Sequence, residues 1–439
     1  MLKTLKFGGS SLSDSNQFAK VKSIVESDDA RRVVIVSAPG KRDEKDIKIT
    51  DLLYLCHAHL KYKVPYDSIR DMIKDRFVEI KEGCGLRLDI AAEVDEMFSK
   101  LNENTSEDYL ASRGEYLNAK LVAEYLGYKF VDASEWLTFD YNGAVNFEES
   151  ERKLKAIYAL NSRIVTPGFY GVLPNGEIKV FSRGGSDVTG AIAAASLDAD
   201  VYENWTDVPG ILMVDPKIVK NPKPISHVTY DELRELSYMG AAVLHEDTVF
   251  PVRRKDIPVN IRNTNLPENP GTLIRETFDD DDDIEHFITG ITGIKNFSIF
   301  NIYKSSVGEA KLGLLRSVLE IFDNYDVPVE EIPSSVDSFS IVVPTASLEG
   351  KKYDLMNSLC ENTSIDKCEL TEGISLVAIV GRQMAFKAGI SGQIFRTLGE
   401  NNINIRTIQQ GSDEINIIVG VYTEDFERTI RVLYDSFAM

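Results

Sequence analysis

The sequence predicts an α/β protein: a three-layer αβα sandwich around a mostly parallel sheet, followed by two ferredoxin-like βαββαβ modules. Three observations lead to this fold class. Short β-rich runs alternate with amphipathic helical stretches as far as Arg275. An unbroken run of aspartates, Asp279–Asp283, then interrupts the pattern. Beyond it, one set of hydrophobic spacings occurs twice. A chain of 439 residues is long enough for two or three domains.

The strands predicted before the aspartate run are short and apolar, and helical stretches such as Tyr109–Leu126 lie between them. In a parallel α/β sheet, ligands bind beyond the carboxyl ends of the strands. Gly8, Ser37, Gly184 and Thr206 lie at predicted strand ends, so we expect them to converge. The predicted strands are Leu2–Phe7, Val33–Ser37, Ile164–Thr166, Lys179–Ser182, Val201–Trp205 and Val259–Arg262.

The aspartate run predicts a boundary between domains, because blocks of like charge are usually solvated. A metal site is the alternative. After this boundary, the spacing of Gly313–Phe322 recurs at Gly389–Leu398 and indicates a helix in each copy. Each copy reads β-α-β-β-α-β, and two modules that only dimerise are the alternative to ligand-binding modules. The expected domains are 1–278, an acidic linker at 279–292, and modules at 293–372 and 373–439.

Composition narrows the functional classes. Sixty-nine acidic residues against 49 basic ones give a net charge of −20, which opposes binding to nucleic acid or to an anionic membrane. An anionic substrate must therefore meet a local cluster of Lys and Arg. There is no apolar run of membrane-spanning length, no secretory signal, and no CxxC or zinc-type spacing among the four cysteines. We expect a cytoplasmic protein.

The segment KFGGSSL, Lys6–Leu12, follows the first predicted strand. Paired glycines let backbone N–H groups approach a ligand closely, and a nearby lysine favours an anion. An ordinary strand-to-helix turn is the alternative, since the spacing of a P-loop is absent.

The segment FSRGGSDVTGAIAAASL, Phe181–Leu197, places two glycines and then an alanine-rich helix after a strand. The helix N-terminus favours anions, and Arg183 can clamp a carboxylate with two hydrogen bonds. Alternatively, Asp187 caps the helix and Arg183 pairs with it.

Three further features are weaker indications of a binding site when each is considered alone. In ENWTDVPGILMVDPK, Glu203–Lys217, a hydroxyl, a carboxylate and a Pro-Gly turn suit a nucleotide, although a surface loop is the alternative. Glu115, in SRGEYLNAKLVAEYL, is placed near the start of a helix, where its charge is favourable, and is otherwise a solvated residue. Ser37 and Thr50 flank the polar loop APGKRDEKDIKI and either bind a ligand or cap local structure.

In this order, KFGGSSL, the hydroxyl-containing loop, RGE, SRGGSD and WTDVPG…DP resemble the amino acid kinase superfamily, and the first part closely resembles the aspartokinases. The C-terminal repeat resembles the tandem ACT domains that aspartokinases carry, so the resemblance covers essentially the whole chain. It implies the amino acid kinase (carbamate kinase-like) fold. It also implies phosphorylation of the β-carboxylate of L-aspartate by MgATP to 4-phospho-L-aspartate, the first step towards lysine, threonine and methionine.

The resemblance also implies roles for the transfer centre. Lys6 should meet the transferring phosphoryl group, with phosphate contacts from Gly8, Gly9 and Ser10, the two glycines through their N–H groups. Asp187 should orient Lys6 rather than act as a strong base, because the attacking carboxylate is already ionised near neutral pH. No protein ligand to a metal is expected.

Substrate and nucleotide contacts follow in the same way. Arg183 should hold the α-carboxylate of aspartate, Glu115 its ammonium group, and Thr50 with Ser37 should contact it from the opposite loop. The remaining implied residues are Gly184, Gly185 and Ser186 for the substrate, and Thr206, Asp207, Asp215 and Lys217 for ATP.

An amino-acid effector, lysine or threonine with lysine favoured, should bind between the ACT modules of two subunits. This implies a homodimer and possibly a tetramer. The matching positions are a loop before the first helix of the repeat, at Gly313, Leu314 and Leu315, and the segment PSSVDS with Ser334, Ser335 and Asp337. Asp337 either binds the effector or closes a turn.

The sequence departs from the family pattern at several positions. The segment GAAVLHE has Ala242 where many members carry a lysine that contacts ATP, and Glu246 after His245, which is interpreted as structural. Leu212 replaces a frequent tyrosine, and the charged insertion Lys41–Lys48 alters a substrate loop.

Two other functions remain as alternatives. One is a kinase of another carboxylate, such as glutamate or N-acetylglutamate. The other is a catalytically silent amino-acid sensor, against which the set of Lys6, Glu115, Arg183 and Asp187 argues. No homoserine dehydrogenase domain is expected, because the chain ends just after the second repeat.

Overall fold

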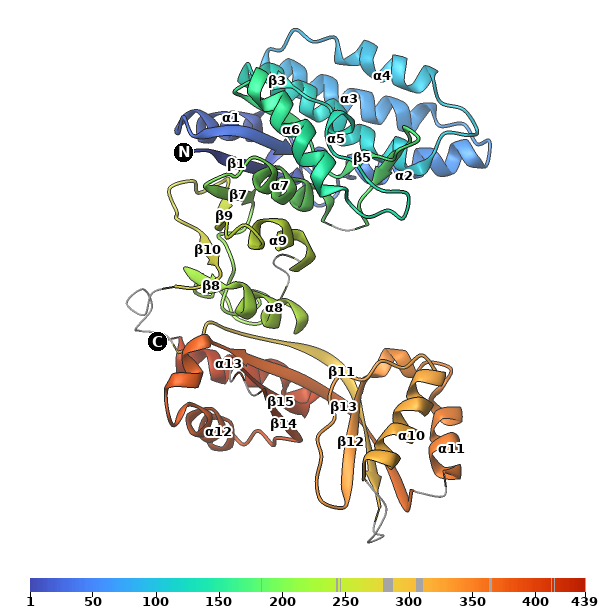
Figure 1. The fold of residues 1–439 in the computed structure, drawn as a ribbon, viewed down its shortest axis with the longest axis vertical. Coiled ribbons are helices and arrows are strands. Elements are labelled where there is room, and N and C mark those ends of the chain that lie inside the picture. The colour runs from blue at the N-terminus through green and yellow to red at the C-terminus, as the bar shows by residue number, and fades with distance from the viewer. Residues whose placement is uncertain are drawn as a thin grey trace. The chain divides into compact units, whose positions relative to one another are not determined.

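The computed structural model describes residues 1–182, 184–241, 244, 246–278, 287–304, 311–362, 365–411, 413 and 415–438. Arg183, Ala242, His245 and the run Asp279–Asp283 lie outside the described residues. The chain forms two compact units (Figure 1). The first contains Met1–Ile211, Pro224–Tyr230 and Val243–Asp279, and the second contains Leu212–Lys223, Asp231–Ala242 and Asp280–Met439.

The first unit is built on an eight-stranded sheet with the order β3-β4-β2-β1-β7-β9-β10-β8. All neighbouring strands are parallel except β9 and β10, so the predicted mostly parallel sheet is confirmed. The strands are β1 (Lys3–Phe7), β2 (Arg31–Val36), β3 (Lys129–Phe130), β4 (Ile164–Pro167), β7 (Val201–Thr206), β8 (His227–Thr229), β9 (Val259–Asn263) and β10 (Thr272–Arg275). A separate hairpin joins β5 (Tyr170–Val172) and β6 (Ile178–Val180).

Helices cover both faces of this sheet, as the alternation along β2 demonstrates. Val34 and Val36 pack into one apolar core, whereas Val33 and Ile35 pack into another on the opposite face. Alternate residues of a strand point to opposite faces, so two cores on one strand define three layers. The helices are α1 (Ser15–Glu26), α2 (Ile49–Lys61), α3 (Asp67–Cys84), α4 (Ile90–Ser99), α5 (Glu107–Leu126), α6 (Phe147–Leu160), α7 (Gly185–Ser196), α8 (Tyr230–Tyr238) and α9 (Glu246–Arg253).

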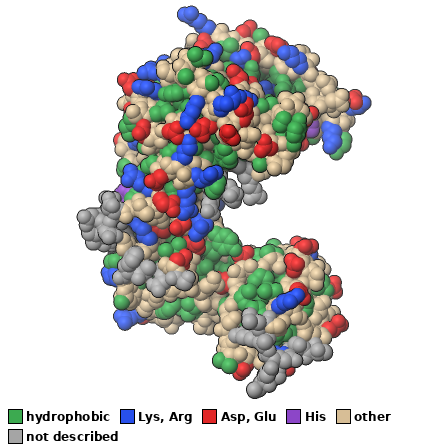
Figure 2. Space-filling view, viewed as in Figure 1, with side chains coloured by type: hydrophobic (Ala, Val, Ile, Leu, Met, Phe, Trp, Pro, Cys, Tyr) green, Lys and Arg blue, Asp and Glu red, His purple; other side chains and the backbone are tan. Residues whose placement is uncertain are grey.

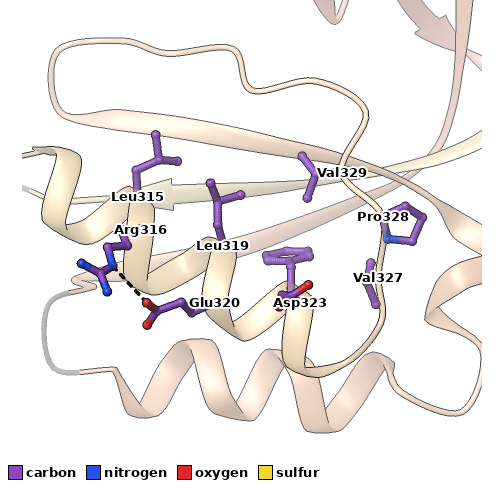
Figure 3. A pocket seen from close by; sticks show the side chains of 9 residues that line it. Leu315, Arg316, Leu319, Glu320, Asp323, Val327, Pro328 and Val329 are labelled. Atoms are coloured by element: carbon purple, nitrogen blue, oxygen red, sulfur yellow. Dashed lines mark hydrogen bonds and ion pairs between the residues drawn. The ribbon is translucent and has the colours of Figure 1, made fainter.

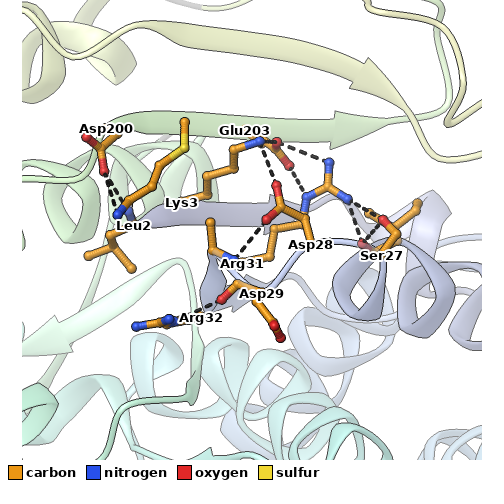
Figure 4. Close-up of polar contacts among 12 residues, drawn as sticks. Leu2, Lys3, Ser27, Asp28, Asp29, Arg31, Arg32, Asp200 and Glu203 are labelled. Carbon is orange, nitrogen blue, oxygen red and sulfur yellow. Dashed lines mark hydrogen bonds and ion pairs between the residues drawn. The ribbon is translucent and has the colours of Figure 1, made fainter.

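A buried ion pair holds β7 against β2 and α1. Glu203 is 1% exposed, and its carboxylate accepts hydrogen bonds from Arg31 Nε at 2.9 Å and Trp205 Nε1 at 2.9 Å. The Arg31 guanidinium also donates to the carbonyl oxygen of Ile24 and the hydroxyl of Ser27 (Figure 4). Every strong polar group of this cluster is therefore matched, as burial of a charge requires.

The second unit contains one five-stranded sheet with the order β12-β11-β13-β15-β14. Two long strands, β11 (Gly290–Tyr303) and β13 (Lys367–Val380), pair antiparallel through its centre. The other elements are α10 (Lys311–Asn324), β12 (Ser338–Pro344), α11 (Lys352–Glu361), α12 (Ile390–Glu400), β14 (Thr407–Gln410), β15 (Asn416–Tyr422) and α13 (Phe426–Phe437). Two apolar cores form on this sheet, one with α10 and α11 and one with α12 and α13.

The two modules share their long strands. Residues Phe297–Tyr303 of β11 pair with β12 in the first module, whereas Gly290–Ile294 pair with Leu376–Val380 of the second. The second module thus takes its fourth strand from Gly290–Ile294, which precede the part of β11 that pairs with β12 in the first module. This differs from a simple tandem, because no strand follows α13 in the described chain to complete the second sheet.

Helix α8, although it follows β8 directly, packs with the second unit over Asp231–Tyr238. Its Glu232 is fully buried and accepts hydrogen bonds from Thr289 Oγ1 at 2.6 Å and from Arg382, through the backbone N at 2.8 Å and the guanidinium at 3.0 Å. Glu235 of the same helix accepts a hydrogen bond from Asn416. A helix that precedes the aspartate run in the sequence is therefore part of the packing of the second unit. Among the described residues, no helix is long and apolar enough to cross a membrane.

We predict that Glu232→Ala destabilises the second unit by about 3 kcal/mol, because it removes a buried carboxylate that accepts hydrogen bonds from Thr289 and from the backbone and guanidinium of Arg382. The free energy of unfolding is measured by denaturant titration. Hydrogen exchange of peptides from β11 and from Arg382–Phe386 then shows whether the loss of stability lies in the second unit. Asp231→Ala, at a partly exposed position on the same helix, is the control and should cost less than about 1 kcal/mol. Equal effects of the two substitutions would contradict this account of Glu232.

Candidate active site

The Lys6 ammonium lies at the centre of a polar cluster on one face of the sheet. Lys6 pairs with Asn204 across the parallel strands β1 and β7, so the two side chains are neighbours. The Nζ atom of Lys6 lies 2.7 Å from Asp187 Oδ1 and 3.4 Å from Asn204 Oδ1. Asn204 Nδ2 in turn donates to Asp187 Oδ1 at 2.8 Å. The cluster holds a nearly buried lysine in one position at the strand end.

Helix α7 supplies Asp187 from its first turn. The helix begins at Gly185, and Gly184 before it has φ +55°, a left-handed conformation that favours glycine. Among the described residues, no side-chain cap is present at this helix start, and the Asp187 carboxylate contacts Lys6 and Asn204 instead, which does not fit the alternative in which Asp187 merely caps. Ser186 is 9% exposed and lies against Gly168, where a Cβ would approach Ser186 Cβ to 2.7 Å. Arg183, at the preceding position, lies outside the described residues.

The two glycines after β1 differ in whether their backbone N–H groups are already hydrogen-bonded. Gly8 N donates to the carbonyl oxygen of Trp205 at 3.0 Å, so this N–H is occupied by the sheet. The expectation that Gly8 offers its N–H to a phosphate is therefore corrected. Gly9 and Ser10 open the short 3₁₀ helix Gly9–Leu12, whose first N–H groups have no intrahelical acceptor. These two residues are the better phosphate donors.

Gly9 also lies in direct contact with the loop after β2. Gly40 N donates to the carbonyl oxygen of Gly9 at 2.8 Å. A Cβ at Gly40 would lie 2.6 Å from the carbonyl carbon of Gly9, and a Cβ at Gly9 would lie 2.8 Å from Ala38 O. Glycine is required at both positions, because the two backbones touch.

Glu115 is buried in the middle of α5, not near the start of a helix, and its exposed fraction is 4%. Burial raises the pKa of this carboxyl group to about 8, against hydrogen bonding to the backbone at Ala38 and the charge of Arg113, which lower it. Its Oε2 atom is buried and has no hydrogen-bond partner among the described residues. The helix-dipole argument and the solvated alternative are both wrong. The carboxyl is instead a buried group with one open acceptor.

The two predicted hydroxyl residues lie on adjoining elements. Ser37 follows β2, and its backbone N donates to Phe7 O at 3.2 Å. Thr50 lies in the first turn of α2 and is partly exposed. The residue before it, Ile49, packs beside Gly114, where a Cβ would lie 3.2 Å from Ile49 Cγ2. The two ends of the loop between β2 and α2 are thus brought next to the Glu115 segment of α5.

The predicted nucleotide residues fall into two groups. Thr206 ends β7 in the first unit, and its hydroxyl donates to Asp207 Oδ1 at 3.2 Å. Asp215 and Lys217 belong to the segment Leu212–Lys223 of the second unit, where Asp215 Oδ1 accepts from the backbone N of Lys217 at 2.8 Å. Within each group the residues are adjacent, and all but Thr206 are exposed.

The predicted effector residues are only partly placed as expected. Gly313, Leu314 and Leu315 lie inside α10, not in a loop before it. Leu314 is 6% exposed and packs in the core, because the helical period turns it towards the sheet, so it is corrected as a ligand contact. Ser334, Ser335 and Asp337 are exposed on the turn that leads into β12.

A cavity of about 630 Å³ lies on the other side of α10 (Figure 3). Leu315 and Leu319 point into it opposite Val329, and the ion pair between Arg316 and Glu320 lies at its rim. In Figure 2 hydrophobic side chains gather over the surface where α10 lies. Of the predicted effector residues, only Leu315 lines this cavity.

Sequence reasoning missed Asn204 and Asn118. Asn204 could have been found from strand register alone, because it faces Lys6 on the next strand. Asn118 is fully buried in α5 and donates from Nδ2 to Ser37 O at 2.7 Å, while its Oδ1 has no partner among the described residues. No local motif marks it. The described residues also contain no group of three or more His, Cys, Asp or Glu side chains that could hold a metal ion.

Comparison with known proteins agrees with this geometry. The amino acid kinase family model matches residues 1–263, and an ACT domain model matches residues 377–437. Aspartokinase 3 of Bacillus subtilis is 34% identical over 451 residues, covering 99% of this chain and 98% of that protein.

Solved structures give the same result. The aspartate kinase of Clostridium acetobutylicum has a TM-score of 0.90 at 47% identity and covers 99% of both chains. Two structures of Escherichia coli aspartokinase III, one with aspartate and ADP and one with lysine and aspartate, have TM-scores of 0.74 and 0.72 at 26% identity over the whole of both chains. The chain therefore belongs to the amino acid kinase family and, within it, to the aspartokinases, a class of kinase.

Proposed function

We propose that the enzyme transfers the γ-phosphoryl group of MgATP to the β-carboxylate of L-aspartate and forms 4-phospho-L-aspartate, the first step towards lysine, threonine and methionine. The observation that carries this proposal is the cluster of Lys6, Asp187 and Asn204 beside the Gly9–Ser10 backbone. The complex of the Escherichia coli enzyme with aspartate and ADP supports the same pair of substrates.

In this mechanism, charge neutralisation is the main task of the protein. Two anions must approach each other, and phosphoryl transfer has a loose transition state that positioning and positive charge stabilise. Lys6 neutralises the transferring group, and Asp187 with Asn204 fixes its ammonium. The N–H groups of Gly9 and Ser10 donate to phosphate oxygens. No general base is needed, because the attacking carboxylate is ionised.

Glu115 and Arg183 are proposed to select the amino acid. The open Oε2 atom of Glu115 suits the substrate ammonium, and Arg183 suits its α-carboxylate. Gly184, Gly185, Ser186, Ser37 and Thr50 complete the substrate site.

Thr206, Asp207, Asp215 and Lys217 are the proposed contacts to ATP, and Mg²⁺ enters with the nucleotide phosphates as MgATP. Ala242 removes one family contact to ATP, and Leu212 changes another position of the same loop region.

Regulation is assigned to the second unit, with domain limits of 1–278, 279–292, 293–372 and 373–439. We take lysine as the inhibitor, supported by the lysine complex of the Escherichia coli enzyme. Gly313, Leu315, Ser334, Ser335 and Asp337 form the proposed effector contacts. A cytoplasmic homodimer through the ACT modules, extending in some conditions to a tetramer, completes the proposal.

The direct test is ATP turnover with L-aspartate, with the acyl phosphate trapped by hydroxylamine. Hydroxamate that depends on aspartate, and not on glutamate or N-acetylglutamate, is expected, and it should fall when lysine is added. Tight lysine binding without hydroxamate would instead identify a silent sensor.

We predict that Lys6→Ala lowers kcat by at least about a hundredfold, because an ammonium that stabilises the transition state is lost. Circular dichroism should show an unchanged fold. Lys100→Ala, an exposed lysine on the end of α4, is the control and should keep wild-type turnover. Near-wild-type kcat in a folded Lys6→Ala variant would refute the assignment.

We also predict that aspartate binding strengthens as the pH rises towards 8. Below its pKa of about 8 the Glu115 carboxyl is protonated and neutral, and an ammonium ligand favours its ionised form, so binding releases a proton. The KM for aspartate should therefore fall by up to about tenfold per pH unit between pH 6 and 7.5. Glu115→Gln should raise this KM and remove its pH dependence. A pH-independent KM in the wild-type enzyme would contradict the role of Glu115.

A further inference from the structure

A buried arginine on α3 contacts the loop between β2 and α2 at two separate points. Arg76 is 5% exposed, although it lies on a helix that contributes no residue to the site described above. Its guanidinium donates from Nη1 to the carbonyl oxygen of Gly40 at 3.0 Å. Nη2 contacts both carboxylate oxygens of Asp46. One side chain thus holds two points of the loop between β2 and α2.

At one of the two points, Gly40 is itself hydrogen-bonded to Gly9, which belongs to the proposed phosphate-binding backbone. Gly40 accepts from Arg76 through its carbonyl oxygen and donates through its N–H to the carbonyl oxygen of Gly9. The backbone at Gly40 cannot move towards Gly9, because even a Cβ there would lie 2.7 Å from Ser10 N. The position of Gly40 therefore fixes the peptide between Gly9 and Ser10, which carries the Ser10 N–H group, and restrains Gly9 next to it.

The Asp46 end organises the charged insertion Lys41–Lys48, which the proposed function leaves without a role. Burial disfavours the charged form of Asp46, but hydrogen bonds from Arg42 and the charges of Arg76 and Arg42 outweigh burial and hold its pKa well below the usual range. The backbone N and Nε of Arg42 both donate to Asp46 Oδ2, at 2.8 and 3.1 Å. The loop is folded around this carboxylate, and α2 with Thr50 begins just after it.

We propose that Arg76 is a positioning residue for phosphoryl transfer, which holds the Gly40–Lys48 loop so that Gly9, Ser10 and Thr50 keep their places. This inference rests on the proposed function. Arg76 contacts no reacting group and acts through Gly40 and Asp46.

Stability alone is a poor explanation for this arrangement. The Nε atom of Arg76 is buried without a hydrogen-bond partner among the described residues, which costs free energy. A well-packed apolar side chain often replaces a buried ion pair at no loss of stability. What an apolar residue cannot do is hold a backbone carbonyl and a carboxylate at the same time, and that is the geometry the loop needs.

The test compares Arg76→Met, Arg76→Lys and Asp46→Asn with Arg70→Met, a partly exposed arginine on the same helix whose ion pairs are to Asp67 and Asp71 and which serves as the matched control. Trapped aspartyl hydroxamate gives kcat and both KM values. Arg76→Met should lower kcat by about ten- to a hundredfold, since small displacements of positioned groups have effects of this size. The melting temperature should change little. Arg76→Lys should restore part of kcat, because a lysine can reach only one of the two acceptors.

A second readout separates positioning from folding. Hydrogen exchange at peptides covering Gly9–Leu12 should become faster in Arg76→Met and remain unchanged in Arg70→Met. An unchanged kcat in a folded Arg76→Met variant would overturn the inference about Arg76. It would leave the proposed function intact as long as the wild-type enzyme forms hydroxamate from aspartate. If Arg76→Met does not fold, the Arg76→Lys variant is used for the same test. Unchanged kcat together with unchanged hydrogen exchange at Gly9–Leu12 in Arg76→Lys would also overturn the inference about Arg76. Absence of hydroxamate in the wild-type enzyme would refute the proposed function instead.

Discussion

The parallel pairing of β1 with β2 on one side and β7 on the other is the constraint on which the site depends. It places Lys6 beside Asn204 and carries the chain from Phe7 into Gly8, whose N–H continues the ladder to Trp205. Because all three strands end at the same edge, the loops after them meet without any long connection. Gly9 and Gly40 can then touch, because they follow the neighbouring parallel strands β1 and β2.

Two buried glutamates differ in whether the fold satisfies their oxygens, and only one of them is a proposed ligand contact. Glu203 is matched by Arg31 and by the indole N–H of Trp205, so its charge is satisfied within the fold. Glu115 is equally buried but keeps one oxygen open, and burial raises its pKa to about 8. An unmatched buried carboxyl is costly, and a cationic ligand is what would remove that cost. In a chain of net charge −20, a buried carboxyl with an open oxygen is a candidate ligand contact, whereas most of the other acidic residues that the structure describes are solvated.

Much of the fold followed from the sequence, because alternation of strands with helices and a repeated helical stripe are strong local signals. Lys6 and Asp187 were found for the same reason, since each lies next to a glycine turn at an element end. Local signals could not find Asn204 or Arg76, whose importance depends on strand register and on a contact between distant segments. They also misplaced Leu314, because a loop and the first turn of a helix have similar polar composition, and they misjudged Glu115, because burial of a mid-helix glutamate depends on packing by the two ends of the loop between β2 and α2. The occupied N–H of Gly8 was equally hidden, since it depends on β7.

The division into units bears on the proposed regulation, because the second unit includes segments from both halves of the sequence. The second unit includes Leu212–Lys223 and Asp231–Ala242, segments that the sequence order assigns to the catalytic half. Helix α8 is tied there by Glu232 to Thr289 and Arg382, yet its first residue follows β8 of the catalytic sheet without a break. An effector can change catalysis only if it binds two arrangements of the second unit with different affinity. Such a difference would act directly on the proposed nucleotide residues Asp215 and Lys217, because they belong to the unit to which effector binding is assigned in the proposed function.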